Sequence, residues 1–225
     1  VMTGQMVEHW RNAIYGDTNY SQVALLPQKD YIREFYETGT LMSNTITASA
    51  GSENITGRLS FTDSRNDGIT PGHEINRQYF DLNTEFNNKW LTVGAKINYM
   101  REKRENTPGQ GEYGLMKQLT VIPRGIRMSD LREDFINSKN RTMNWSGPSD
   151  MYSNPYGLVM SENGNSNILN RLIGQIRATI HFTDYLSLTG RAGIDYFNTN
   201  YKTRAIYLPD GSNTCLLYTS DAADE

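Results

Sequence analysis

The feature that most constrains the fold is an alternation of apolar and polar residues with a period of two, sustained over long segments. In residues 91–99, every second residue from Leu91 to Tyr99 is apolar or aromatic, and the residues between them are polar or glycine. Successive side chains of a β-strand point to opposite faces, so this period predicts a strand with one apolar and one polar face. The same alternation predicts five further strands, at residues 45–50, 55–61, 80–86, 172–182 and 186–196.

The connections between the predicted strands alternate between short and long. Residues 51–54, 87–90 and 183–185 are expected to form tight turns, whereas residues 62–76 and 102–167 are long connections. Outer-membrane β-barrels combine short turns at one end with long loops at the other, and their strands are apolar outside and polar inside. Such barrels also carry girdles of aromatic residues at both membrane interfaces. Aromatic residues gather here near strand ends in a similar way, namely Phe86, Trp90, Tyr99, Phe182, Tyr185, Tyr196 and Phe197.

These patterns predict an all-β fold, an antiparallel transmembrane β-barrel segment of about six strands with one long external loop that contains short helices. A soluble β-sandwich or a lipocalin-like barrel is the alternative. Strands of ordinary sheets are about five or six residues long, shorter than the alternating segments here. The polar faces carry both acidic and basic residues, a mixture that suits a wet or filled lumen, including Arg58, Asp81, Glu85, Lys96, Arg177, Arg191 and Asp195.

Composition excludes several classes of protein. The formal charge is −3, with 22 basic and 25 acidic residues, so the chain lacks the basic surface with which proteins bind nucleic acid. No apolar run approaches the roughly 18 to 20 residues of a membrane-spanning helix. The first residues carry no basic and apolar export signal, so we expect either a cytoplasmic protein or an interior piece of a longer one.

The last eleven residues, 215–225, are expected to be foreign to the protein. They correspond, codon for codon, to a translated transposase-type sequencing adapter, and they contain the only cysteine, Cys215. Without their three acids, residues 1–214 carry 22 basic and 22 acidic groups. The expected organisation is therefore a loop and helical segment at 1–42, barrel strands and loops at 43–214 with the external loop at 102–167, and the adapter-like tail at 215–225.

Motifs for catalysis, nucleotides or metals are weak. Residues 109–114 match G-x-G-x-x-G, but a charged segment precedes them instead of the buried parallel strand that a nucleotide site requires, so a loop is expected. The three histidines, His9, His73 and His181, are scattered, and no second histidine follows His73-Glu74 at zinc-protease spacing. We expect no catalytic residue, no metal site and no cofactor.

The long connection at 102–167 is expected to be functional, because structureless connections of this length are uncommon in compact domains. Helices are predicted at residues 114–122 and 129–136. Three aromatic residues near its end, Trp145, Tyr152 and Tyr156, lie among polar residues. Aromatic platforms with polar neighbours commonly hold sugars, so these three are the candidate ligand contacts. The alternative is that they pack the loop or contact a surface lipoprotein.

Several segments resemble SusC/RagA-type TonB-linked outer-membrane transporters of Bacteroidetes. The resemblance covers residues 29–211, and no single short motif is diagnostic. It is carried, in order, by the sequences DYIREF followed by Gly39, NTITASAGSE, RLSF, NDGI and NPY, at residues 30–35, 44–53, 58–61, 66–69 and 154–156. Ser52 departs from the family pattern, which has a second glycine at that turn, and Tyr31 stands where the family often has tryptophan.

The resemblance implies an energised importer in the cell outer membrane. Such proteins have a 22-stranded barrel closed by a plug domain, a SusD-like surface lipoprotein that captures an oligosaccharide or peptide, and a TonB complex that acts through the plug. The plug and the TonB-contacting segment would precede residue 1, and the lipid bilayer would surround the strands. Six strands would not fold stably alone, because both edges stay unpaired. The alternatives are a small outer-membrane barrel that serves as anchor or adhesin, and a soluble β-rich carbohydrate-binding module.

Overall fold

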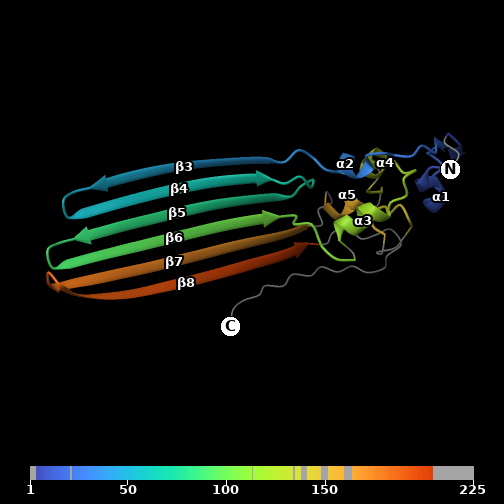
Figure 1. Cartoon of the computed structure of the whole chain (residues 1–225). Coiled ribbons are helices and arrows are strands. Elements are labelled where there is room, and N and C mark those ends of the chain that lie inside the picture. The colour runs from blue at the N-terminus through green and yellow to red at the C-terminus, as the bar shows by residue number, and fades with distance from the viewer. Residues whose placement is uncertain are drawn as a thin grey trace.

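The computed structural model describes residues 4–20, 22–112, 114–133, 135–137, 141–147, 152–159 and 164–204. It consists of a six-stranded antiparallel sheet and a group of short helices and loops gathered beyond one end of that sheet (Figure 1). The adapter-like segment 215–225 lies outside the described residues.

All six predicted strands are present, and each pairs with its neighbour in the sequence. The order is β3-β4-β5-β6-β7-β8, with every pair antiparallel. Within the described residues the sheet is open, and β3 and β8 form its two edges. The strands span Thr40–Gly51 (β3), Ile55–Asp67 (β4), Glu74–Asn87 (β5), Leu91–Glu105 (β6), Gly164–Thr183 (β7) and Leu186–Arg204 (β8).

The strands are longer than predicted, which corrects the extent of the connections. The predicted long connection at 62–76 shrinks to residues 68–73, because β4 and β5 extend through most of it. The external loop, predicted at 102–167, is residues 106–163, because β6 and β7 continue into it. The strands contain from 12 residues in β3 to 20 in β7, beyond the roughly 9 to 11 that cross a bilayer.

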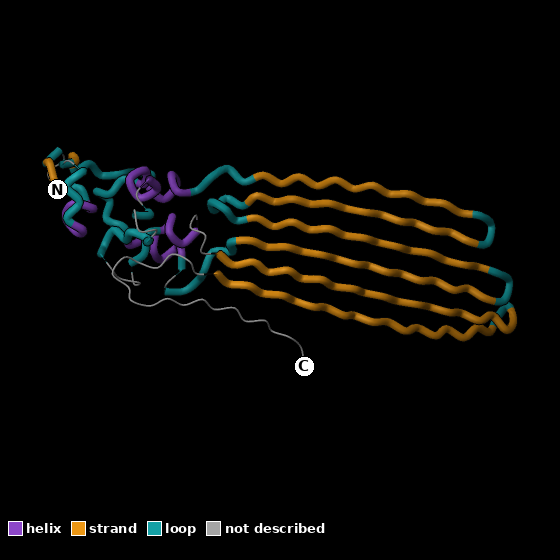
Figure 2. Tube along the Cα trace, turned by 180° about the vertical axis from the view of Figure 1, so that it is seen from behind, coloured by secondary structure: helices purple, strands orange, loops and turns teal. Residues whose placement is uncertain are grey.

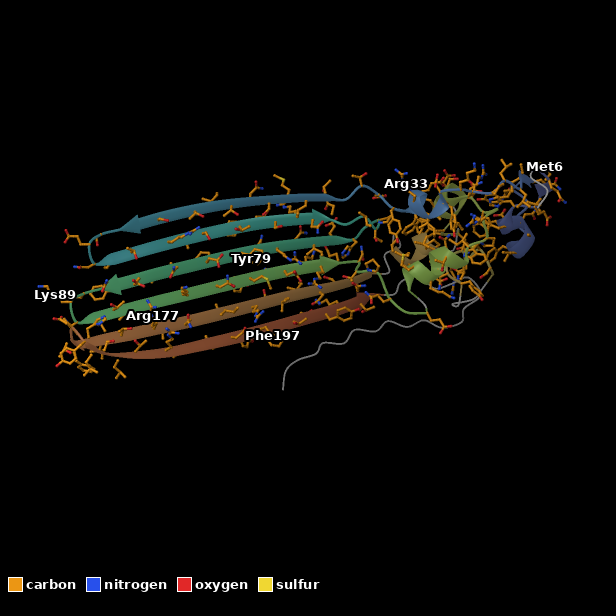
Figure 3. All side chains as sticks on the ribbon, viewed as in Figure 1. Met6, Arg33, Tyr79, Lys89, Arg177 and Phe197 are labelled. Carbon is orange, nitrogen blue, oxygen red and sulfur yellow. The ribbon has the colours of Figure 1, made fainter. Side chains whose placement is uncertain are left out.

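The three tight turns all lie at one end of the sheet, and the long connections lie at the other (Figure 1). Ser52 N–H donates to the Ile55 carbonyl in the first turn, and Asn88 N–H donates to the Leu91 carbonyl in the second. In Figure 3, Lys89 marks the turn end, while Arg33 and Met6 lie beyond the opposite end. The chain before β3 therefore lies on the same side as the external loop.

We call the described residues of 4–36 and 106–159 the cap. The helix predicted at residues 114–122 corresponds to α3, and the helix predicted at residues 129–136 corresponds to α4, which ends at Glu133. The other elements of the cap were not predicted individually. The cap contains β1 (Met6–Val7), α1 (Trp10–Tyr15), β2 (Val23–Ala24), α2 (Tyr31–Phe35), α3 (Leu115–Val121), α4 (Met128–Glu133) and α5 (Pro155–Val159). No helix in the described part of the chain is long and apolar enough to cross a membrane.

The buried hydrophobic core lies in the cap and not in the sheet. Its buried residues come from both sequence segments of the cap, for example Phe35 from α2 and Leu119 from α3. By contrast, most of the large apolar side chains of the sheet are exposed. In both views, no described helix covers either face of the sheet (Figure 2). Among the described residues, the apolar side chains of the sheet therefore have no protein layer to pack against.

Candidate functional site

One face of the sheet carries a band of apolar side chains that ends abruptly on the side of the cap. Along β6 the band runs from Leu91 to Tyr99, about 27 Å at the usual rise of an antiparallel strand. Its last row crosses all six strands, and its four aromatic residues are each at least 36% exposed. That row consists of Ile46, Phe61, Phe80, Tyr99, Leu172 and Tyr196.

The next row of the same face, towards the cap, is entirely polar. It contains Asn44, Asp63, Gln78, Arg101, Asn170 and Asn198. A packed protein core would not require such an abrupt change along one face. An apolar band roughly 25 Å tall, bordered by exposed aromatic side chains, is typical of the lipid-facing side of an outer-membrane barrel.

The opposite face, which we call the polar face, carries most of the charged side chains of the inner strands. Arg177 Nη2 lies 3.0 Å from Glu85 Oε2, and Figure 3 places Arg177 in the half of β7 near the turns. Arg171 binds Asp195 with two hydrogen bonds, from Nε at 2.9 Å and from Nη2 at 2.6 Å. Ion pairs thus link β5 to β7 and β7 to β8.

A third charged cluster lies on the polar face near the cap. The Glu102 carboxylate, whose side chain is 6% exposed, binds both Arg77 and Arg104. Two cations around one nearly buried carboxylate compensate the cost of removing that carboxylate from water. The sequence did not predict this cluster, because residues 100–105 show no alternation of apolar and polar residues that would place Glu102 in a strand.

The polar face is also hollowed. A cavity of about 750 Å³ lies over β4 to β8, and its charged lining residues are Arg58, Asp81, Lys96 and Asp195. Asn98 donates a hydrogen bond from its side-chain amide to Asp81. The hollow therefore lies on the face that the sequence assigned to a lumen.

The cap is held together by a buried amide at its centre. The Asn154 side chain, which is fully buried, donates to the carbonyls of Leu131 at 3.0 Å and Met143 at 3.2 Å. Its Oδ1 accepts from the Tyr156 N–H at 3.0 Å. One side chain thus fixes three loop segments, and the short resemblance motif at 154–156 coincides with it.

The three predicted ligand contacts have different environments. Tyr156 is 3% exposed, and its ring lies 4.9 Å from that of Phe35, so it packs in the core of the cap. Burial raises the pKa of the Tyr156 phenol above its usual range. This environment matches the packing role that the sequence left as the alternative, and sugar contact by Tyr156 stays a prediction.

Trp145 and Tyr152 form a separate aromatic pair. Their rings lie 5.8 Å apart, Trp145 is half-buried, and Tyr152 is 38% exposed. The buried indole Nε1 of Trp145 has no hydrogen-bond acceptor in the part of the chain that the structure describes. The indole donor is closed to solvent, whereas the exposed Tyr152 ring offers an aromatic surface for a ring-shaped ligand, so this pair is the more accessible part of the predicted site.

The described residues of the glycine-rich motif and His9 both lie in the cap. The G-x-G-x-x-G segment follows the antiparallel strand β6, and its described residues, 109–112 and 114, form no helix before α3. His9 Nε2 lies 3.5 Å from Asp130 Oδ2 within the cap. Among the described residues, no group of three or more His, Cys, Asp and Glu side chains is placed to hold a metal ion.

Comparison with known sequences gives no assignment. No protein-family model matches the chain, and no curated protein matches it significantly. The faces of the sheet, the cap and the motifs quoted above are therefore the features that bear on function.

Proposed function

We propose that this chain is a segment of a large transmembrane β-barrel that takes part in TonB-dependent uptake of oligosaccharides or peptides across a bacterial outer membrane. The observation that carries the proposal is the boundary on the apolar face, where an exposed aromatic row is followed by an entirely polar row. Lipid is the solvent that this exposed band requires.

The open sheet supports a larger barrel. Backbone N–H and C=O groups at the edges of β3 and β8 have no partner strand among the described residues. Unpaired backbone groups are costly in a hydrocarbon environment, so a lipid-facing sheet must close on itself. Further strands would pair with both edges and complete the barrel, with the polar face lining the lumen.

In the proposed barrel, the two ends of the sheet lie on opposite sides of the membrane. The tight turns would face the periplasm and the cap would lie outside the cell, as in other outer-membrane barrels. The strands continue beyond the aromatic row towards the cap, which raises the cap above the membrane surface. In that position the cap would meet a SusD-like lipoprotein, and the pair of Trp145 and Tyr152 would be available to a captured substrate. TonB would act through a plug domain outside this chain.

Uptake by cells tests the proposal. The complete protein is produced with its export signal and its lipoprotein in a bacterium that lacks other related importers, and uptake of fluorescent oligosaccharides and peptides is measured. We expect protein in the outer-membrane fraction and uptake that is lost on deletion of TonB or addition of an uncoupler. Protein in the soluble fraction, or uptake that persists without TonB, would contradict the proposal.

The substitution Trp145→Ala in the complete protein tests the aromatic pair separately. We expect at least a tenfold loss of substrate affinity with unchanged membrane insertion. Leu158→Ala, which alters another exposed position of the cap, is the control. Unchanged affinity in Trp145→Ala would discard the ligand contact but would leave the barrel proposal intact.

A further inference from the structure

The polar face carries an excess of positive charge that its own ion pairs do not neutralise. Four of its basic side chains lie in the ion pairs described above, with Glu85, Glu102 and Asp195. Three more, Arg58, Lys96 and Arg191, have no ion-pair or hydrogen-bond partner within the described residues. The one carboxylate of this face outside those ion pairs is Asp81, which Asn98 binds.

The three cations lie close together across the middle of the sheet. Arg58 and Lys96 belong to the same row, separated by Asn83 on β5, so their backbones are about 10 Å apart, or two strand spacings. Arg191 lies on β8, one row nearer the turns, opposite Arg177. All three are exposed on the polar face.

The cations line two neighbouring hollows. Arg58 and Lys96 lie on the cavity of about 750 Å³, which also contains the carboxylates of Asp81, bound by Asn98, and Asp195, bound by Arg171. Lys96 and Arg191 lie on an adjacent cavity of about 300 Å³ together with the ion pair of Glu85 and Arg177, so this smaller cavity has a net positive charge. Side chains of like charge inside a hollow with low-dielectric walls concentrate the electrostatic field and attract ions of opposite sign. Arginine also binds carboxylates through two parallel hydrogen bonds, which adds geometric selectivity to the charge.

We propose that Arg58, Lys96 and Arg191 form a binding site for a carboxylate-bearing ligand on the luminal face of the sheet. Two carboxylates of the ligand, separated by about 10 Å, would contact Arg58 and Lys96, and a third would reach Arg191. This inference depends on the proposed barrel, in which the polar face lines the lumen. Acidic oligosaccharides and acidic peptides share the required chemistry.

Calorimetric titration of the complete protein in detergent tests the site with three probes of similar length: an oligouronate, an oligoglutamate and a neutral oligosaccharide. We expect at least one acidic probe to bind at least ten times more tightly than the neutral one, and the affinity to fall as salt is added. The tighter acidic probe identifies the source of the carboxylates. Equal affinity for all three probes, or binding of none, would overturn the site.

The triple variant Arg58→Gln, Lys96→Gln and Arg191→Gln removes the charges and retains polar side chains. We expect it to lose at least tenfold in affinity for the acidic probe. The control is Arg101→Gln, because Arg101 is an exposed cation on the opposite face of β6. A triple variant that keeps its affinity within twofold would overturn the site.

A measurement of insertion into vesicles separates the two proposals. A protein that inserts but shows no preference for acidic probes contradicts the binding site alone. A protein that binds acidic probes in detergent but fails to insert contradicts the barrel.

Discussion

Glu85 and Arg177 form an ion pair although their strands are not neighbours in the sheet. Arg177 Nη2 on β7 reaches Glu85 Oε2 on β5 at 3.0 Å, and the residue between them on β6 is Gly94. A Cβ at position 94 would lie 3.8 Å from Glu85 Oε2 and 3.9 Å from Arg177 Nη2. The absence of a side chain on β6 therefore opens the path along which the two charges meet.

Enlarging residue 94 should break this ion pair. The two side chains are 45% and 42% exposed, so we expect a coupling energy of about 0.5 kcal/mol from a double-mutant cycle of Glu85→Gln and Arg177→Gln. In a Gly94→Leu background the coupling should vanish, whereas Gly94→Ala, which makes ordinary contacts, should retain it. Urea unfolding of the complete protein in vesicles measures both cycles. Equal coupling in the leucine background would show that the gap at Gly94 is not required.

A charge on the apolar band should be much more costly than the same charge one residue away. Ile176 lies in the band and is 52% exposed, and its neighbour Gln175 lies on the polar face. We expect Ile176→Arg to lower the free energy of unfolding in vesicles by about 2 to 4 kcal/mol, because the arginine faces hydrocarbon. Gln175→Arg should change it by less than about 1 kcal/mol. Equal effects would contradict a lipid-facing band.

Phe35 should hold the N-terminal part of the cap to the external loop. It is 1% exposed and packs against Tyr156, so Phe35→Ala should cost about 3 to 5 kcal/mol of local stability. We expect faster hydrogen exchange in residues 115–159 and unchanged exchange in β4 to β7, because the sheet does not depend on this core. Ile69→Ala, at an exposed position, serves as the control. Unchanged exchange in the loop would contradict a joint core.

Replacing Asn154 by alanine should loosen the cap from its centre. The change leaves the Leu131 and Met143 carbonyls and the Tyr156 N–H without their present partner, at about 1 to 3 kcal/mol for each buried polar group. Limited proteolysis should therefore cut the external loop of this variant sooner than that of the parent. Asn19→Ala, at an exposed position, should leave the cleavage rate unchanged.

The sequence predicted the parts of the strands in which one face is apolar. It did not predict the parts in which both faces are polar. In β6, alternation marks residues 91–99, but residues 100–105 are mainly charged on both faces. The sequence pattern therefore did not show that the strand continues to residue 105. The same holds for β4 beyond Phe61 and for β5 before Phe80. Backbone pairing with neighbouring strands extends these segments, and pairing of that kind leaves no hydropathy signal.

The candidate site was predictable only in part, for a similar physical reason. Aromatic residues in a polar loop indicated Trp145 and Tyr152, but nothing in the local sequence showed that Tyr156 would pack against Phe35, 121 positions earlier. The buried side-chain amide of Asn154 donates hydrogen bonds to the carbonyls of Leu131 and Met143, which belong to two other segments of the loop. Contacts between distant segments become visible only in the fold.

Spin labels along β7 test the central claim most directly. Single cysteines are placed in turn at residues 172–180 of a cysteine-free form of the complete protein in vesicles. Each spin label is tested for collisions with oxygen and with a water-soluble nickel complex. We predict that labels at even-numbered positions, from Leu172 to Ile180, collide mainly with oxygen, because they face lipid, and that odd-numbered labels collide less with oxygen. Labels that show no alternation, or that all collide mainly with the nickel complex, would contradict a membrane-spanning sheet.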